Sequence, residues 1–229
     1  MKHLLLTLSI MVVCFYTAEA QNEITIHVDG RPLAELITTE QQEVLQTLNI
    51  TGKLTEEDYA FIRNNSLPKL KALNLREADI DTIPVKAFYN YDKDNYDKEY
   101  QITLPEELVY IGDSAFFEAN VSLVLAGRFP KRGVNTTFRE REIVTITLTE
   151  DNEYCKLHTT GMLWPYYPSN YILSSDGKVL YYANDVFREV IPEGVEIIAE
   201  KAYEGRVCSD ILFPKSLKEI EDYAFSYIY

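Results

Sequence analysis

The chain has few of the residues on which most enzymes depend. Its 229 residues include 3 cysteines, 3 histidines and 1 tryptophan. No HExxH, GxSxG or GxGxxG pattern occurs anywhere in it, which removes the common motifs of zinc proteases, serine hydrolases and dinucleotide-binding enzymes. We therefore expect a protein without enzyme activity and without a cofactor.

Basic residues are scarce as well. Lys and Arg number 22 against 36 Asp and Glu, so the formal net charge is −14 at pH 7. Nucleic acids and anionic membranes bind surfaces with an excess of Lys and Arg, and we expect neither as a partner. Solubility explains the acidic excess, and a cationic or metal partner stays open as an alternative.

Long apolar runs are missing after the first 20 residues, so no transmembrane span is predicted. The one early run, Leu4–Tyr16, is too short to span a bilayer, and a small-x-small cleavage pattern ends at Ala20. Residues 1–20 are therefore predicted to be a signal peptide, and the mature chain to be secreted or displayed on the cell surface. Val13 disfavours lipid attachment at Cys14, because bacterial lipoprotein signals place a small residue before that cysteine.

In place of catalytic motifs the chain has an internal repeat. The segments LPEELVYIGDSAF (104–116), IPEGVEIIAEKAY (191–203) and FPKSLKEIEDYAF (213–225) align without a gap. All three have an apolar residue at position 1, Pro at 2, Leu or Val at 5, Ile at 8, Ala at 12 and an aromatic residue at 13. The last two begin 22 residues apart, which indicates the period.

The repeated positions predict short coils that stack on one another. Position 1 ends a strand, and Pro at position 2 ends its ladder because it has no N–H. Positions 5 and 8 face inward, Ala at 12 permits a close neighbour, and the aromatic residue at 13 fills the core. One coil alone buries too little apolar surface to offset the entropy of ordering its backbone. Leu70-x-x-Leu73-x-Leu75 matches the LxxLxL strand signature of leucine-rich repeats. We therefore expect an α/β-type repeat solenoid, a right-handed leucine-rich repeat coil with one strand per repeat of about 22 residues.

The repeat domain is predicted to cover residues 45–229, after an N-terminal cap region at 21–44. Within the cap, Glu23–Val28 alternates polar and apolar residues and predicts a strand, with short helical turns after it. Thr55 and Asp58 have the spacing of a capping box, which predicts a helix. Clear copies of the repeat are predicted near 70–88, 101–119, 188–205 and 210–229.

Two segments interrupt the period. Residues 154–184 are predicted to form an insertion that contains a β-hairpin, with its turn at Asp176-Gly177. Residues 89–100, YNYDKDNYDKEY, are acidic and rich in tyrosine. Asp97 stands where a calcium-binding EF-hand loop needs glycine. We interpret this segment as a solvated loop, and a cation site stays an alternative.

The remaining cysteines and histidines do not predict a metal site. Cys155 and His158 are three residues apart, a spacing that would suit a nucleophile or a metal pair. Zinc needs three or four ligands, and only Cys208 and His27 remain in the mature chain. Cys155 and Cys208 are interpreted as separate buried thiols, with a disulfide as the alternative in an exported protein.

The candidate binding site is a row of outward strand residues. Thr103, Val190 and Leu212 each stand just before position 1 of a clear copy, so stacking would align them. Two of the three are apolar, which is unusual on a sheet that faces water. β-propensity or a covering loop would explain them equally well.

The three 13-residue copies, with the opening TGKLTEEDYAFIRNNSLPKLKALNL (51–75), resemble BspA-like leucine-rich repeats (LRR_5 type) of surface and secreted proteins from gut and oral anaerobic bacteria. With weaker, eroded middle copies, the resemblance covers about residues 45–229. It implies a non-enzymatic role in adhesion, with an unknown protein or glycan of host matrix or another cell surface as the partner. The alternative is a structural or assembly subunit that docks through its C-terminal coil, which is predicted to leave an open edge near Tyr229.

Overall fold

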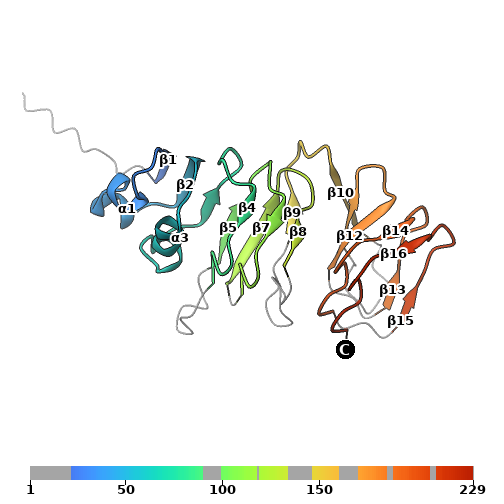
Figure 1. The fold of residues 1–229 in the computed structure, drawn as a ribbon. Coiled ribbons are helices and arrows are strands. Elements are labelled where there is room, and N and C mark those ends of the chain that lie inside the picture. The colour runs from blue at the N-terminus through green and yellow to red at the C-terminus, as the bar shows by residue number, and fades with distance from the viewer. Residues whose placement is uncertain are drawn as a thin grey trace, which may run out of the picture.

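Successive coils each add one strand to a parallel sheet that runs through the N-terminal part of the molecule (Figure 1). Every neighbouring pair of strands in this sheet is parallel. In sheet order the strands are β1 (Glu23–Val28), β2 (Thr47–Gly52), β3 (Ala72–Asn74), β5 (Tyr100–Thr103), β7 (Val121–Leu125) and β9 (Ile146–Leu148). The arrangement confirms the expected solenoid of stacked repeats.

The computed structural model describes residues 22–89, 99–117, 119–133, 146–159, 170–184, 188–206 and 210–228. The predicted signal peptide with Cys14, residues 90–98 of the tyrosine-rich loop, Cys208 and Tyr229 lie outside these ranges.

Several coils carry a second, two-residue strand, whereas the sequence predicted one strand per repeat. These strands form a three-stranded parallel sheet of β4 (Thr82–Ile83), β6 (Tyr110–Ile111) and β8 (Lys131–Arg132). In β4 and β6 the second residue is the isoleucine of position 8. Two residues are too few to show an alternating pattern, so a second sheet was not predictable from the sequence.

The C-terminal part is built around the predicted hairpin. β10 (Cys155–Thr159), β11 (Asn170–Ser174) and β12 (Val179–Asn184) are antiparallel neighbours, and the short strands β14 (Ile197–Ile198) and β16 (Glu219–Ile220) extend the same sheet in parallel from β12. The strands that precede position 1 of the last two copies, β13 (Arg188–Val190) and β15 (Asp210–Leu212), form a separate two-stranded sheet.

The hairpin also divides the hydrophobic interior into two clusters. On β11, Ile172 belongs to the N-terminal cluster, whereas Tyr171 and Leu173 belong to the C-terminal one. On β12, Tyr182 and Ala183 are divided in the same way. One face of the insertion therefore packs against the N-terminal stack of coils, and its other face packs against the C-terminal stack.

The helices of the described chain lie at the N-terminal end: α1 (Leu33–Leu36), α2 (Thr39–Gln42) and α3 (Glu56–Arg63). Thr38 and Thr55 begin α2 and α3 with capping boxes, the second with Asp58 as predicted. The buried carboxylate of Asp58 also accepts a 2.7 Å hydrogen bond from the Leu33 backbone N–H, which ties α1 to α3. In the ranges that the structure describes, no helix has the length and hydropathy needed to cross a bilayer.

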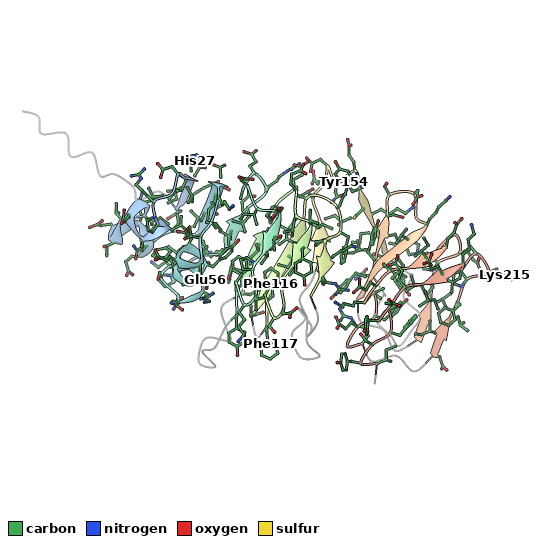
Figure 2. All side chains as sticks on the ribbon, in the orientation of Figure 1. His27, Glu56, Phe116, Phe117, Tyr154 and Lys215 are labelled. Carbon is green, nitrogen blue, oxygen red and sulfur yellow. The ribbon has the colours of Figure 1, made fainter. Side chains whose placement is uncertain are left out.

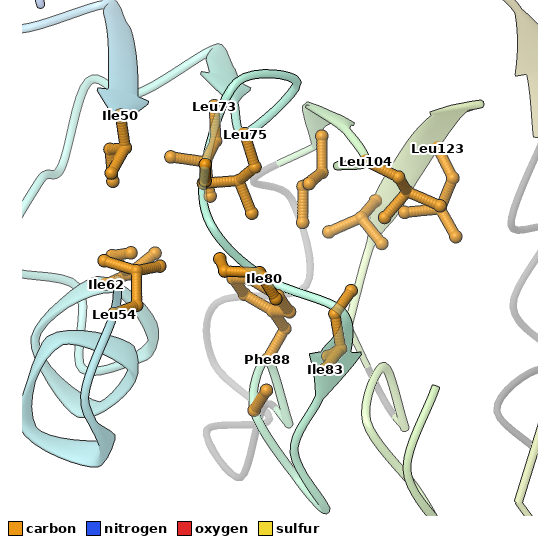
Figure 3. Packing of buried hydrophobic residues seen from close by; sticks show 14 of the residues in the cluster. Ile50, Leu54, Ile62, Leu73, Leu75, Ile80, Ile83, Phe88, Leu104 and Leu123 are labelled. Carbon is orange, nitrogen blue, oxygen red and sulfur yellow. The ribbon is translucent and has the colours of Figure 1, made fainter. Parts of the chain in front are cut away.

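The repeated motif positions build the interior as expected. Ala115 and Phe116, at positions 12 and 13, are both fully buried, as are Ala202 and Tyr203 one stack further on. In the close view, Ile80, Ile83 and Phe88 lie across the interior from the leucines of the long strands (Figure 3). Repetition of the motif thus reflects packing between coils and leaves the outward side chains free to vary.

Position 11 of the motif has a backbone conformation that the sequence did not reveal. Lys86, Ser114, Lys201 and Tyr223 all occupy this position, and their φ angles lie between 54° and 60°. This left-handed region is unfavourable for residues other than glycine. Four copies thus keep one tight turn at a cost in local strain, because the turn places Ala at 12 and the aromatic residue at 13 in the core.

We expect Ser114→Gly to raise the free energy of unfolding by about 0.5–1 kcal/mol, since relief of the left-handed strain exceeds the added freedom of the unfolded chain. Urea unfolding followed by circular dichroism would measure the change. Ser122→Gly, in strand β7, is the matched control and should be destabilising, because glycine weakens a strand. Equal destabilisation by both substitutions would contradict the strain argument.

Candidate binding surfaces

The outward face of the six-stranded sheet carries mostly polar side chains in register. One row consists of Thr25, Asn49, Asn74, Thr103, Val124 and Thr147. A second row consists of Glu23, Thr47, Ala72, Gln101 and Ser122. All of these side chains are exposed or half-buried, while most of the alternate residues of the same strands are buried. We call these two rows the polar face.

Hydrogen bonds between coils hold the side chains of the polar face in place. The Asn74 Nδ2 donates to Asn49 Oδ1 at 3.2 Å, and Asn49 Nδ2 donates to Glu23 Oε1 at 2.9 Å. On β1, His27 Nδ1 and Thr51 Oγ1 share a hydrogen bond of 3.0 Å; His27 is labelled in Figure 2. These side chains lose little further freedom when they bind a partner, which lowers the entropic cost of recognition.

An ion-pair network fixes one margin of the polar face. The guanidinium of Arg76, just beyond β3, contacts Glu106 Oε2 at 3.3 Å and the Asp151 carboxylate at 2.7 and 3.1 Å. Hydrogen bonds from Arg76 hold the pKa of Asp151 below its usual value. Glu106 follows β5 and Asp151 follows β9, so the Arg76 side chain links the turns of three different coils.

The three residues predicted as one outward row do not share a sheet. Thr103 is half-buried on the polar face, in β5. Val190 and Leu212 face each other across β13 and β15 and are 51% and 63% exposed. The expectation of a continuous row is corrected here, because β10 to β12 are inserted between β9 and β13. The structure therefore separates a polar surface from an apolar C-terminal pair.

Asn49 and Asn74 are surface residues that the sequence interpretation missed. Both have the signal that could have revealed them, since each is a polar residue between buried neighbours on a strand: Leu48 and Ile50 for one, Leu73 and Leu75 for the other. Both residues lie outside the 13-residue motif, so the repeat itself does not point to them.

The Cys155 and His158 side chains do not form a joint site. They are three residues apart on β10, and side chains alternate between the faces of a strand, so the two lie on opposite faces. Cys155 is a buried free thiol whose pKa burial raises to about 11, and the ring of His158 lies beside Tyr171. Within the described ranges, no three His, Cys, Asp or Glu residues are placed to hold a metal ion.

Buried charges join the two stacks of coils. Arg132, on β8, stands at position 8 of an eroded copy, where the clear copies have isoleucine. Its guanidinium donates to the Lys201 carbonyl at 2.6 Å, and Lys201 Nζ donates to the carbonyls of Arg132 and Gly133, both at 2.7 Å. Burial lowers the pKa of Arg132 and raises that of nearby Glu204. We call the Arg132–Lys201 pair the clasp.

Comparison with known families agrees with this architecture. The family model of the BspA type leucine-rich repeat region matches the chain in six copies, over residues 9–126 and 177–228. The match leaves out residues 127–176, which hold β8 to β11, where the period is interrupted. No curated protein and no solved structure matches the chain significantly.

Proposed function

Since the chain belongs to the BspA type leucine-rich repeat family, we propose that it is an exported, non-enzymatic binding protein that recognises its partner through the polar face. Membership of this repeat family supports protein binding as the general role of the chain. The apolar run before Ala20 supports export. Adhesion to a protein or glycan of host matrix or of another cell is the specific role that we propose.

One observation carries the choice of surface. Apart from Glu23, Ala72 and Val124, the polar face offers amide and hydroxyl groups in two aligned rows, with neighbouring strands about 4.8 Å apart. Such a surface suits a partner that presents many hydrogen-bonding groups along its length, as a protein edge or a glycan chain does. Because Asn49 and Asn74 are already tied to each other, the surface is ordered before the partner arrives.

A screen against immobilised matrix proteins and a glycan array would identify the partner. The double variant Asn74→Lys/Thr103→Lys should then bind about tenfold more weakly or worse, because long cations replace short groups at the centre of the polar face. Val85→Lys/Val109→Lys adds the same charge at two exposed sites beside the short strands and should bind normally. Equal binding by both variants, each shown to be folded, would reject the polar face.

The exposed pair Val190 and Leu212 is a second candidate surface. An apolar pair in direct contact with water can anchor a protein partner. Val190→Ser/Leu212→Ser therefore belongs in the same screen. Loss of binding in this variant, with normal binding by Asn74→Lys/Thr103→Lys, would assign recognition to the C-terminal sheet.

A further inference from the structure

Two carboxylates on the polar face are held in place by donors on the neighbouring strand. Glu23 Oε1 accepts a hydrogen bond from Asn49 Nδ2 at 2.9 Å, and Glu99 Oε1 accepts one from Ser122 Oγ at 2.8 Å. Both glutamates are exposed. Since a carboxylate has about four acceptor positions on its two oxygens, each of them keeps capacity for a donor from a partner.

The rows of the polar face supply no cation to balance these two charges. Neither row contains Lys or Arg. At the margin, the guanidinium of Arg76 is shared by Glu106 and Asp151, so that network is net negative. Eight Asp or Glu and four Lys or Arg occupy the turns after the strands of this sheet, at residues 29–31, 53, 76–79, 104–107, 126–130 and 149–153. The polar face and its margin are therefore acidic.

This charge determines which class of partner the polar face fits. Sulfated glycans and other polyanions would be repelled by an acidic surface. A neutral glycan gains little, because neither row contains Phe, Tyr or Trp and so offers no ring for the apolar side of a sugar. A polypeptide with basic side chains supplies cations for the carboxylates, and its backbone N–H and C=O groups match the amides and hydroxyls of the rows.

The positions of the two carboxylates set a spacing for those cations. Glu23 on β1 shares a row with Gln101 on β5, and Glu99 comes two residues before Gln101. Three strand intervals of about 4.8 Å and two residues of about 3.3 Å separate the glutamates, a distance of about 16 Å. In an extended peptide, residues four positions apart point the same way and lie about 13 Å apart. The flexible four-carbon stem of Lys covers the difference.

We propose that the polar face binds an extended polypeptide segment with Lys or Arg residues four positions apart, and that Glu23 and Glu99 are its anchors. This inference rests on the proposed function of the polar face and names the class of its partner. It also gives a role to part of the acidic excess of the chain, for which a cationic partner was one explanation.

Fluorescence anisotropy with labelled peptides tests the partner class. The probe is a peptide of about twenty residues that repeats Lys-Ser-Thr-Ser, which sets its Lys residues four apart. It should bind saturably and more weakly as salt is raised, because exposed charges are screened. A peptide of the same composition with all its Lys at one end should bind about fivefold more weakly, since it cannot reach both anchors. Absence of binding by the repeat peptide, or equal binding of the two peptides, would overturn the proposal.

Two isosteric substitutions test the anchors. Glu23→Gln/Glu99→Gln removes both charges but keeps side-chain oxygens that can accept from Asn49 and Ser122, and it should weaken binding of the repeat peptide about tenfold. Glu57→Gln/Glu219→Gln removes the same charge from exposed positions on α3 and β16 and should bind like the wild type. Equal weakening by the two variants would assign the attraction to the overall charge of −14 and overturn the proposal. Wild-type affinity in Glu23→Gln/Glu99→Gln would overturn it as well.

The partner found in the binding screen separates this inference from the proposed function. Loss of that partner by Asn74→Lys/Thr103→Lys, with normal binding by Glu23→Gln/Glu99→Gln, would keep the polar face as the binding surface and reject the cationic segment. Normal binding by Asn74→Lys/Thr103→Lys would reject the polar face and this inference together. Weaker binding by both variants is the result that we expect.

Discussion

Phe116→Ala is expected to lower the free energy of unfolding by about 3–5 kcal/mol, the largest effect that a single core substitution should have in this chain. The Phe116 ring is fully buried and stacks on Phe88 with centroids 5.2 Å apart and an interplanar angle of 5°. Phe88 in turn meets the edge of Tyr59 at 5.5 Å. Truncation therefore removes one ring of a packed aromatic column and opens a buried cavity beside the stacked ring of Phe88.

Urea unfolding at equilibrium measures this loss. Phe225→Ala is the matched control, since Phe225 occupies the same position 13 in the last described coil and is only half-buried. The loss of stability in Phe225→Ala should be less than half that in Phe116→Ala, because truncation of a half-buried ring leaves a smaller cavity. Equal losses at the two positions would show that stacking between coils does not determine the stability of the repeat.

Lys201→Met is expected to cost about 2–5 kcal/mol and to destabilise the coils beside the clasp more than the distant N-terminal coils of β2 and β3. Loss of the Lys201 ammonium leaves the buried carbonyls of Arg132 and Gly133 without these donors, and each unsatisfied group costs about 1–3 kcal/mol. The guanidinium of Arg132 also keeps its charge in a buried site. Methionine preserves most of the side-chain volume, so the loss reports on the polar contacts.

Hydrogen exchange read separately for the two stacks distinguishes this effect from general destabilisation. Amides of β14 and β16 should lose protection in Lys201→Met, while those of β2 and β3 should keep theirs. Lys178→Met is the control, because Lys178 is 55% exposed, forms a surface pair with Glu196 at 3.8 Å, and should contribute little. Uniform loss of protection across both stacks would contradict the role of the clasp as the link between them.

Much of the fold follows from local sequence signals. Alternation in Glu23–Val28 predicted β1, the Thr55–Asp58 spacing predicted the start of α3, and Asp176-Gly177 predicted the turn between β11 and β12. Each of these signals lies within a few residues, where backbone preference and hydrogen bonding act directly. The 13-residue motif predicted the stacking because every clear copy repeats the same inward residues.

Features that depend on distant contacts were not predictable. Arg132 and Lys201 are 69 residues apart, and a basic residue at an inward position gives no hint of which carbonyl it meets. The left-handed turn at position 11 carries Lys, Ser or Tyr and lacks the glycine that usually marks such a turn. The division of the outward strands into two sheets depends on where the hairpin packs, which the period of the repeat does not encode.

The candidate binding surface was likewise only partly predictable from the sequence. Thr103 was predicted because it stands next to the motif, and the structure places it on the polar face. Asn49 and Asn74 lie outside the 13-residue motif, so their alignment with Thr103 appears only when the register of β2, β3 and β5 is known. Residues that repeat are occupied with packing, and we locate recognition in residues that do not.

The most direct test of that account is a binding titration with the first matrix protein or glycan that the screen identifies. Wild type, Asn74→Lys/Thr103→Lys and Val85→Lys/Val109→Lys would be titrated under one buffer condition. We expect the dissociation constant to rise about tenfold or more for Asn74→Lys/Thr103→Lys and to stay unchanged for Val85→Lys/Val109→Lys. Wild-type affinity in Asn74→Lys/Thr103→Lys would contradict the assignment of recognition to the polar face.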